Sequence, residues 1–277
     1  MTQAAGRLIR PDGAQCFDPP PLTGGPRNDR CTGVAILMTT LFTCFHLAAA
    51  QDEGWSITLS AAANLLQMGS VNETLDMTVA DWNSNAIPIG PFPHFQSAVS
   101  YSARVVYRLD DQLGLTASVS TYGAKASDSY SDAQNYLSLD RSVGATDALV
   151  GVLYYLPPLV YRIDPYVLVE VGPVFARADG STYQTQTVTN GGQTQTTVAT
   201  NTLAAYRKTS GALGIGLGAT MAVTDTWLLR GDLGYKFAKV GQMEGTLTRI
   251  AGTFEDTSTT DFDYSAFTIS LGIGIAF

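Results

Sequence analysis

The chain has 277 residues, of which 45% are hydrophobic and only 14% are charged, and its formal net charge is −8. This length suits one barrel or sandwich domain, and the acidic balance argues against a nucleic-acid partner because few basic residues are available to neutralise phosphates. After residue 50 no apolar run reaches the roughly 18 residues of a spanning helix, which excludes a helical membrane bundle.

The first 50 residues are typical of an N-terminal extension followed by a signal peptide. Arg27 and Arg30 precede an apolar run over 34–47, and the small residues that follow predict cleavage after Ala50. We therefore expect export and a mature domain over 51–277. A buried helix is the alternative interpretation of the apolar run.

All cysteines of the chain precede the predicted cleavage site: Cys16, Cys31 and Cys44. We therefore expect the mature domain to contain no disulfide, no thiolate nucleophile and no cysteine metal site.

Eight segments of the mature domain alternate between apolar residues and small or polar ones. This period of two is typical of strands that have one apolar face and one polar face. It predicts strands at about 54–66, 97–109, 113–123, 146–156, 165–178, 209–222, 227–239 and 262–277.

The last segment shows the clearest alternation, because large apolar residues occupy every second position up to the end: Phe267, Ile269, Leu271, Ile273, Ile275 and Phe277. A soluble edge strand with such a face would invite aggregation, whereas lipid would cover it. The ending resembles the C-terminal strand of bacterial outer-membrane β-barrels, in which a final Phe is the assembly signal. The resemblance implies that the barrel-assembly machinery recognises this strand.

The predicted connections alternate in length. Three of them take only about three to eight residues, while the other four take about 20 to 30. Short turns at one end and long loops at the other are the plan of outer-membrane barrels, with the loops outside the cell. In the loop over about 179–207, Thr- and Gln-rich segments flank Asn190, Gly191 and Gly192, which predicts a hairpin. This loop is either an adhesive surface or a solvated low-complexity segment.

Aromatic residues on the apolar faces predict two girdles at the lipid interfaces. Trp227 and Phe237 are ten positions apart, which matches the roughly 9–11 residues with which a tilted strand crosses a bilayer. The residues near the turn end are Trp55, Tyr107, Tyr154, Trp227 and Phe277, and those near the loop end are Phe175, Phe237 and Phe267.

The polar faces carry four cations and three anions: Arg104, Arg108, Asp147, Glu170, Arg230, Asp232 and Lys236. Side chains can fill the interior of an eight-stranded barrel, and an unpaired charge there is costly. We therefore predict a network of paired charges that plugs the barrel. A narrow conduction path with a mildly cationic lining is the alternative.

The mature domain has one histidine, His94, in a proline-rich segment with Ser97 nearby. Catalysis by a histidine and a hydroxyl would need further relay groups, and none is evident in the strands. The acidic residues of the loops lack the spacing of a calcium loop. We predict no enzymatic activity, no cofactor and no metal site; an envelope-lipid-modifying enzyme is the remaining alternative.

The architecture and the last strand together resemble the small eight-stranded outer-membrane barrels of the OmpA, OmpX and OmpW group, without a periplasmic domain. The expected fold class is all-β, a transmembrane antiparallel up-and-down barrel. The resemblance implies a location in a Gram-negative outer membrane, in contact with its lipid and lipopolysaccharide. The expected role is a structural or surface-interaction scaffold whose loops could bind a ligand; a porin-like channel for small solutes or ions is the alternative.

Overall fold

The computed structural model describes residues 54–84, 89–132, 134–157, 163–190 and 193–277. The chain divides into two units, Met1–Gln51 and Asp52–Phe277. The predicted extension and signal peptide therefore lie outside the described residues. No helix in the described part of the second unit is long and apolar enough to cross a membrane.

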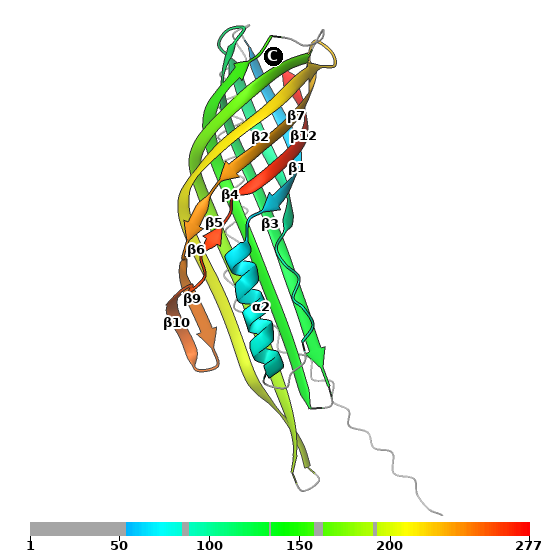
Figure 1. Ribbon diagram of the computed structural model, residues 1–277, viewed down its shortest axis with the longest axis vertical. Coiled ribbons are helices and arrows are strands. Elements are labelled where there is room, and N and C mark those ends of the chain that lie inside the picture. Colours follow the sequence, from blue (N-terminus) through cyan, green and yellow to red (C-terminus); the bar gives the residue numbers. More distant parts are fainter. Residues whose placement is uncertain (1–53, 85–88, 133, 158–162, 191–192) are drawn as a thin grey trace, which may run out of the picture. The chain divides into compact units, whose positions relative to one another are not determined.

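Eight antiparallel strands form a closed ring (Figure 1). Each strand pairs with the next along the chain, and the last one closes the ring by pairing with both the first and the seventh. The predicted up-and-down eight-stranded barrel is confirmed. Its strands are β1 (Trp55–Leu66), β2 (Ser97–Arg108), β3 (Leu113–Ser131), β4 (Asn135–Tyr155), β5 (Ile163–Asn190), β6 (Gln193–Ala222), β7 (Trp227–Phe237) and β12 (Ala266–Ala276).

The barrel wall is apolar outside and largely polar inside, the reverse of a soluble protein. A small apolar cluster that includes Val106, Leu153 and Leu168 is also buried inside. On the outward face Leu271 is 74% exposed, whereas the inward Arg230 is 3% exposed. Polar side chains such as Thr58 and Ser100 are likewise buried inside. This inversion follows from the strict alternation of each strand, because lipid favours the large apolar side chains and the narrow interior holds the polar ones.

Four strands are much longer than the sequence predicted. β3 and β4 continue until residues 132–134 join them, so the long coil expected between about 123 and 146 does not exist. β5 and β6 likewise pair as far as Asn190 and Gln193, which confirms the predicted hairpin. Figure 1 shows these strands continuing past the barrel on the side opposite the C-terminus.

The extensions of β3 and β4 were not predicted because their pattern of apolar and polar faces reverses. Within the barrel the apolar residues of β4, such as Val150 and Val152, point outward and are exposed. Beyond the barrel the apolar residues Leu137 and Leu139 instead point inward and are buried, while polar residues face outward. Water replaces lipid there, so the outward face no longer selects apolar side chains.

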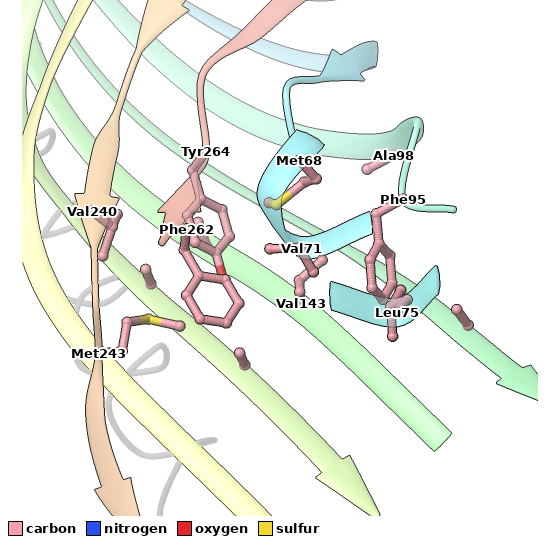
Figure 2. Close-up of a cluster of buried hydrophobic side chains, with 14 of the residues drawn as sticks. Met68, Val71, Leu75, Phe95, Ala98, Val143, Val240, Met243, Phe262 and Tyr264 are labelled. Carbon is pink, nitrogen blue, oxygen red and sulfur yellow. The ribbon is translucent and has the colours of Figure 1, made fainter. Parts of the chain in front are cut away.

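The segment expected as a long loop between the first two strands contains a helix, α2 (Gly69–Ser84). Its buried residues Val71, Leu75 and Val79 recur every four positions and form one stripe. This stripe packs onto an apolar core between the helix and the strand extensions (Figure 2). The Asn72 side chain accepts a hydrogen bond from the backbone N–H of Phe95 (2.8 Å), which holds the segment after the helix.

The last long connection is also ordered. It contains β8 (Lys239–Gly241), β9 (Glu244–Arg249), β10 (Gly252–Thr257) and β11 (Phe262–Asp263). β9 adds to the extended part of β6 and β10 pairs with β9, while β8 and β11 form a separate two-stranded sheet. The extended sheet beside the barrel therefore includes β9 and β10.

Candidate functional site in the barrel interior

Alternate residues of four strands place charged side chains inside the barrel. Arg104 comes from β2, Asp147 from β4, Glu170 from β5, and Arg230, Asp232 and Lys236 from β7. All six side chains are largely enclosed, and the most exposed of them, Arg104 and Asp232, reach only 15%. Because alternate residues of each strand face inward, positive and negative side chains lie together in the narrow interior.

The largest group of charges crosses the interior. The Arg104 guanidinium lies 2.9 Å from a Glu170 carboxylate oxygen and 3.2 Å from an Asp232 carboxylate oxygen. Arg230 also contacts Asp232, at 3.2 Å. The Tyr166 hydroxyl donates a hydrogen bond to Asp232 (2.5 Å). Strands β2, β5 and β7 are therefore connected to one another through the lumen.

A second group lies next to it. Lys236 forms an ion pair with Asp147, which also accepts a hydrogen bond from the Ser120 hydroxyl at 2.7 Å. The Lys236 ammonium lies 4.3 Å from the centroid of the Tyr122 ring. This pair connects β7 to β4 and leaves neither charge alone in the interior.

Arg108 lies apart from these two groups. Its guanidinium pairs with Asp164 at 3.0 Å and stacks over the Tyr155 ring, 4.4 Å from the centroid. Both members of this pair are about one third exposed or more. Asp164 was not among the residues predicted from the sequence, because it precedes the segment whose alternation was recognisable.

With Asp164 added to the residues predicted from the sequence, this described set contains four cations and four anions rather than four and three. The lining is thus balanced, and each of these eight charges contacts an opposite one. Tyr166 was also missed as a partner, although its position on the inward face could have been read from the period of β5. In the described part of the interior, the buried polar atoms without a partner are Arg104 Nε and Thr116 Oγ1.

An apolar layer adjoins the charged one. Figure 2 shows Met68, Phe95, Val143 and Tyr264 converging between α2, the strand extensions and the β8–β11 region. Tyr122 belongs to both layers, because its ring contacts Lys236 and its hydroxyl donates a hydrogen bond to the Tyr264 carbonyl at 3.1 Å. The two layers are therefore in direct contact, and the apolar one lies beyond the charges on the side away from the C-terminus.

The His94 ring lies at the surface, 2.9 Å from the Asp76 carboxylate of α2. Among the described residues, Asp76 is its hydrogen-bond partner, and Ser97 does not bond to it. A shallow depression of about 510 Å³ opens nearby, beside the start of α2, and is lined by Leu66, Gln67, Met68, Gly69, Ser70, Asn72, Phe95, Gln96 and Asp263. His94 does not line it. The described residues contain no group of three or more His, Cys, Asp or Glu that could hold a metal ion.

The aromatic residues singled out from the sequence lie on the outward face. The rings of Trp55 and Tyr107 contact each other at a tilt, with centroids 4.6 Å apart, near the turn end of β1 and β2. The other residues of this set are exposed to different degrees on the outer wall: Tyr154, Phe175, Trp227, Phe237, Phe267 and Phe277.

The C-terminal strand lies between β7 and β1, and its alternate apolar residues point away from the barrel. Phe267, Ile269, Leu271, Ile273 and Phe277 are exposed, and Ile275 is partly so. The Phe277 N–H donates a hydrogen bond to the Trp55 carbonyl (2.9 Å), which ties the two ends of the barrel sheet together.

Comparison with known sequences identifies one family. The profile described as "Outer membrane protein beta-barrel domain" matches residues 34–273. A search of curated proteins finds no match.

Among solved structures, the chain is similar to several outer-membrane proteins at low identity. The attachment invasion locus protein Ail of Yersinia pestis is 13% identical over 81% of this chain and 99% of its own, with a TM-score of 0.39. A major outer membrane protein of Thermus thermophilus is 12% identical over 81% and 100%, with a TM-score of 0.45. OprG of Pseudomonas aeruginosa is 11% identical over 81% and 96%, with a TM-score of 0.41.

Proposed function

The chain belongs to the outer membrane protein β-barrel domain family and is located in the Gram-negative outer membrane. We propose that it acts there as a closed barrel that carries a rigid surface scaffold. In this proposal the barrel anchors the protein and does not conduct solutes. The ordered extensions of β3–β6, with α2 and the β9–β10 hairpin, form the part that meets other molecules.

One observation carries this proposal: Arg104 bridges the lumen to two anions on different strands. Two strands separate β2 from β5 in the wall, and two separate β2 from β7, so these contacts span the interior. Moving Arg104 aside to admit ions would leave Glu170 with a buried, uncompensated charge, which is strongly unfavourable. The neighbouring apolar layer adds a second barrier, because ions do not enter a dry apolar region without losing hydration.

The balanced charge of the interior also favours a scaffold over the alternative, a porin-like channel for small solutes or ions. A selective pore presents an excess of one sign to passing ions. Here each of the lumen charges is engaged with an opposite one. A network of this kind stabilises the barrel and blocks it at the same time.

Two further parts of the proposal concern how the barrel is assembled and whether His94 has a catalytic role. The exposed alternation that ends at Phe277 is the feature through which the barrel-assembly machinery would bind the C-terminal strand. We assign no catalytic role to His94, because a histidine held at the surface by one carboxylate lacks the nucleophile that hydrolysis of envelope lipids needs.

Single-channel recording tests the proposal. Protein purified from outer membranes, and shown to be folded by a heat-modifiable gel band, is expected to give no discrete conductance steps in a planar bilayer. Reproducible steps would contradict the closed barrel. If their ion selectivity then changed in the Lys236→Glu variant, the channel alternative would replace the scaffold.

A further inference from the structure

The outward face of β5 changes character in a fixed order from the barrel to its tip. Val169, Val171 and Phe175 are exposed apolar residues of the barrel wall. Arg177 follows at the next outward position after Phe175, and Tyr183 lies on the same face farther out. At ~3.3 Å per residue, Arg177 lies about 7 Å beyond Phe175 along the strand.

Arg177 has a cation opposite it on the neighbouring strand. In the register of β5 and β6 it is paired with Arg207. Arg207 contacts Asp179 at 2.7 Å, whereas Arg177 has no hydrogen-bonding or ionic partner for its guanidinium among the described residues. Like charges placed directly opposite each other in a sheet are destabilising unless an anion lies between them.

The Arg177 side chain extends sideways over β4, because Gly144 leaves space there. A Cβ atom at Gly144 would lie 2.8 Å from Arg177 Nε. The next strand also has a glycine at this level, since Gly144 is paired with Gly123 of β3. Lys125, two residues beyond Gly123 on the same outward face, is exposed and likewise has no ionic partner among the described residues.

The two glycines thus place no side chain on this part of the outer wall, so the cations of β5 and β3 lie beside a surface made of backbone. The charge of Asp179 is already neutralised by Arg207. The second anion near Arg207 is Glu244, which is paired with Arg207 on the other side of β6 from Arg177. The remaining charge of Arg177 and Lys125 suits a phosphate group, which guanidinium binds through paired hydrogen bonds.

The level of this site indicates which phosphate it meets. Aromatic residues such as Phe175 mark the outer boundary of the apolar layer in membrane barrels, and charged lipid headgroups lie just beyond that boundary. Farther out on the same face, Tyr136 and Tyr183 form an exposed pair with ring centroids 6.3 Å apart. Exposed aromatic rings of this kind offer an apolar face to sugar rings.

We propose that the outward face of β3, β4 and β5 binds lipopolysaccharide of the surrounding leaflet, with a phosphate of its lipid part held by Arg177 and Lys125 over Gly144 and Gly123, and its sugars on Tyr136 and Tyr183. Acyl chains, phosphate and sugar would then follow the order of Phe175, Arg177 and Tyr183 along β5. This inference rests on the location and scaffold role proposed above. In this proposal the extended part of the barrel binds the glycolipid of the outer leaflet directly.

Binding of defined lipopolysaccharide to delipidated full-length protein in a neutral detergent tests the proposal. The probes are lipopolysaccharide with a sugar core, the same molecule after dephosphorylation, lipid A without the core, and inorganic tripolyphosphate. Arg177→Gln is expected to weaken binding of the intact molecule roughly tenfold, because a charge-assisted hydrogen bond is lost. Lys125→Gln is expected to act in the same direction. Arg249→Gln, which removes a cation from the β9–β10 hairpin, is the matched control and should leave binding unchanged.

Wild-type protein should bind the dephosphorylated molecule as weakly as Arg177→Gln binds the intact one. Tyr183→Ala should weaken binding of the molecule with a sugar core and leave binding of lipid A alone intact. Equal binding of intact lipopolysaccharide by wild type and Arg177→Gln, with both folded by gel shift, would overturn the proposal. Competition by tripolyphosphate at the affinity of the glycolipid would also overturn it, because the site would then be one for free phosphate.

The two proposals fail separately. Conductance steps would contradict the closed barrel but would not change the binding measurements. If Arg177→Gln did not weaken binding, the glycolipid site would be contradicted. The absence of conductance steps would still support the closed barrel.

Discussion

Arg104 and Glu170 lie on strands that are not neighbours in the barrel wall, yet their side chains form an ion pair of 2.9 Å across the lumen. The Arg104 side chain is 15% exposed and that of Glu170 is 5% exposed. A buried pair of this kind contributes little net stability compared with an apolar replacement, but removal of one partner leaves the other charge unpaired.

Glu170→Gln is expected to lower the free energy of unfolding by about 1–3 kcal/mol, because a charge-assisted contact is lost while Asp232 still pairs with Arg104. The change keeps the size of the side chain and removes its charge, so Arg104 loses its shorter ionic contact. Urea unfolding of the protein in lipid vesicles, followed by tryptophan fluorescence, measures the difference.

Asp164→Asn is the matched control for this variant. It also removes one anion from a lumen pair, but Arg108 and Asp164 are 36% and 40% exposed. Water compensates the lost contact there, so we expect a change of about 0–1 kcal/mol. Equal destabilisation by the two variants would show that burial of the Arg104 group does not determine its contribution.

Gly218 leaves space for Tyr166 on the inward face of β6. A Cβ atom at this position would lie 2.3 Å from the Tyr166 hydroxyl oxygen and 2.7 Å from the Gly231 carbonyl oxygen. Gly218→Ala should displace Tyr166 from Asp232 and destabilise the barrel by about 1–3 kcal/mol, as overpacking does. The same urea titration measures it.

Gly214→Ala is the control, because it lies on the same face of the same strand. The nearest atom to its added Cβ would be 3.8 Å away, an ordinary contact distance. We expect a small effect or none. If both alanine variants were equally stable, Tyr166 would not require the space at Gly218.

The membrane part of the fold could be predicted because lipid imposes one rule on every strand. Large apolar residues must face outward, so the periods that end at Phe277 and at Phe237 identify strands and their faces together. The rule ends where lipid ends. Leu137 and Leu139 keep the period of two but face inward, so a search for outward apolar residues stops before them.

The residues that face the interior could be predicted, but the pairs that they form could not. Alternation shows that Arg104 and Asp232 face inward, yet strands far apart in sequence decide that they meet at 3.2 Å. The partner of Arg108 was missed because Asp164 lies at the very start of β5, where no alternation precedes it. Helix α2 was missed because one short apolar stripe within a polar connection is a weak signal.

Leu75 anchors α2 to the apolar core. Its side chain is 7% exposed, between Val71 and Val79 on the buried stripe. Leu75→Ala should remove about 2–5 kcal/mol of packing and therefore release the helix locally. Hydrogen exchange by mass spectrometry is expected to show faster exchange over 69–84, with unchanged protection in the barrel strands.

Met77→Ala is the control on the same helix, because this side chain is 59% exposed. Helix protection should stay at the wild-type level in this variant. Unchanged exchange in Leu75→Ala would indicate that the helix is held by other contacts, such as the hydrogen bond between Asn72 and Phe95.

Tyr206 connects β6 to the β9–β10 hairpin. Its hydroxyl donates a hydrogen bond to the Asp256 carboxylate at 2.6 Å, over Gly245, which is paired with both residues and has no side chain to intervene. Burial, and then the hydrogen bond to the Asp256 carboxylate, raise the pKa of Tyr206 to about 12. The bond needs the protonated hydroxyl, and the folded-state pKa lies above the ordinary value near 10. Its stabilising contribution is thus complete below about pH 10 and is lost as the pH rises toward 12.

The titration of Tyr206 can be isolated by subtracting the phenolate absorbance of Tyr206→Phe from that of the wild-type protein. We expect the difference to have its midpoint near pH 12. Asp256→Asn should move the midpoint toward the ordinary value, because the carboxylate no longer opposes ionisation of the phenol. A wild-type midpoint near pH 10 would mean that Tyr206 and Asp256 are not joined in solution, and that the β9–β10 hairpin is held to β6 by its backbone pairing alone.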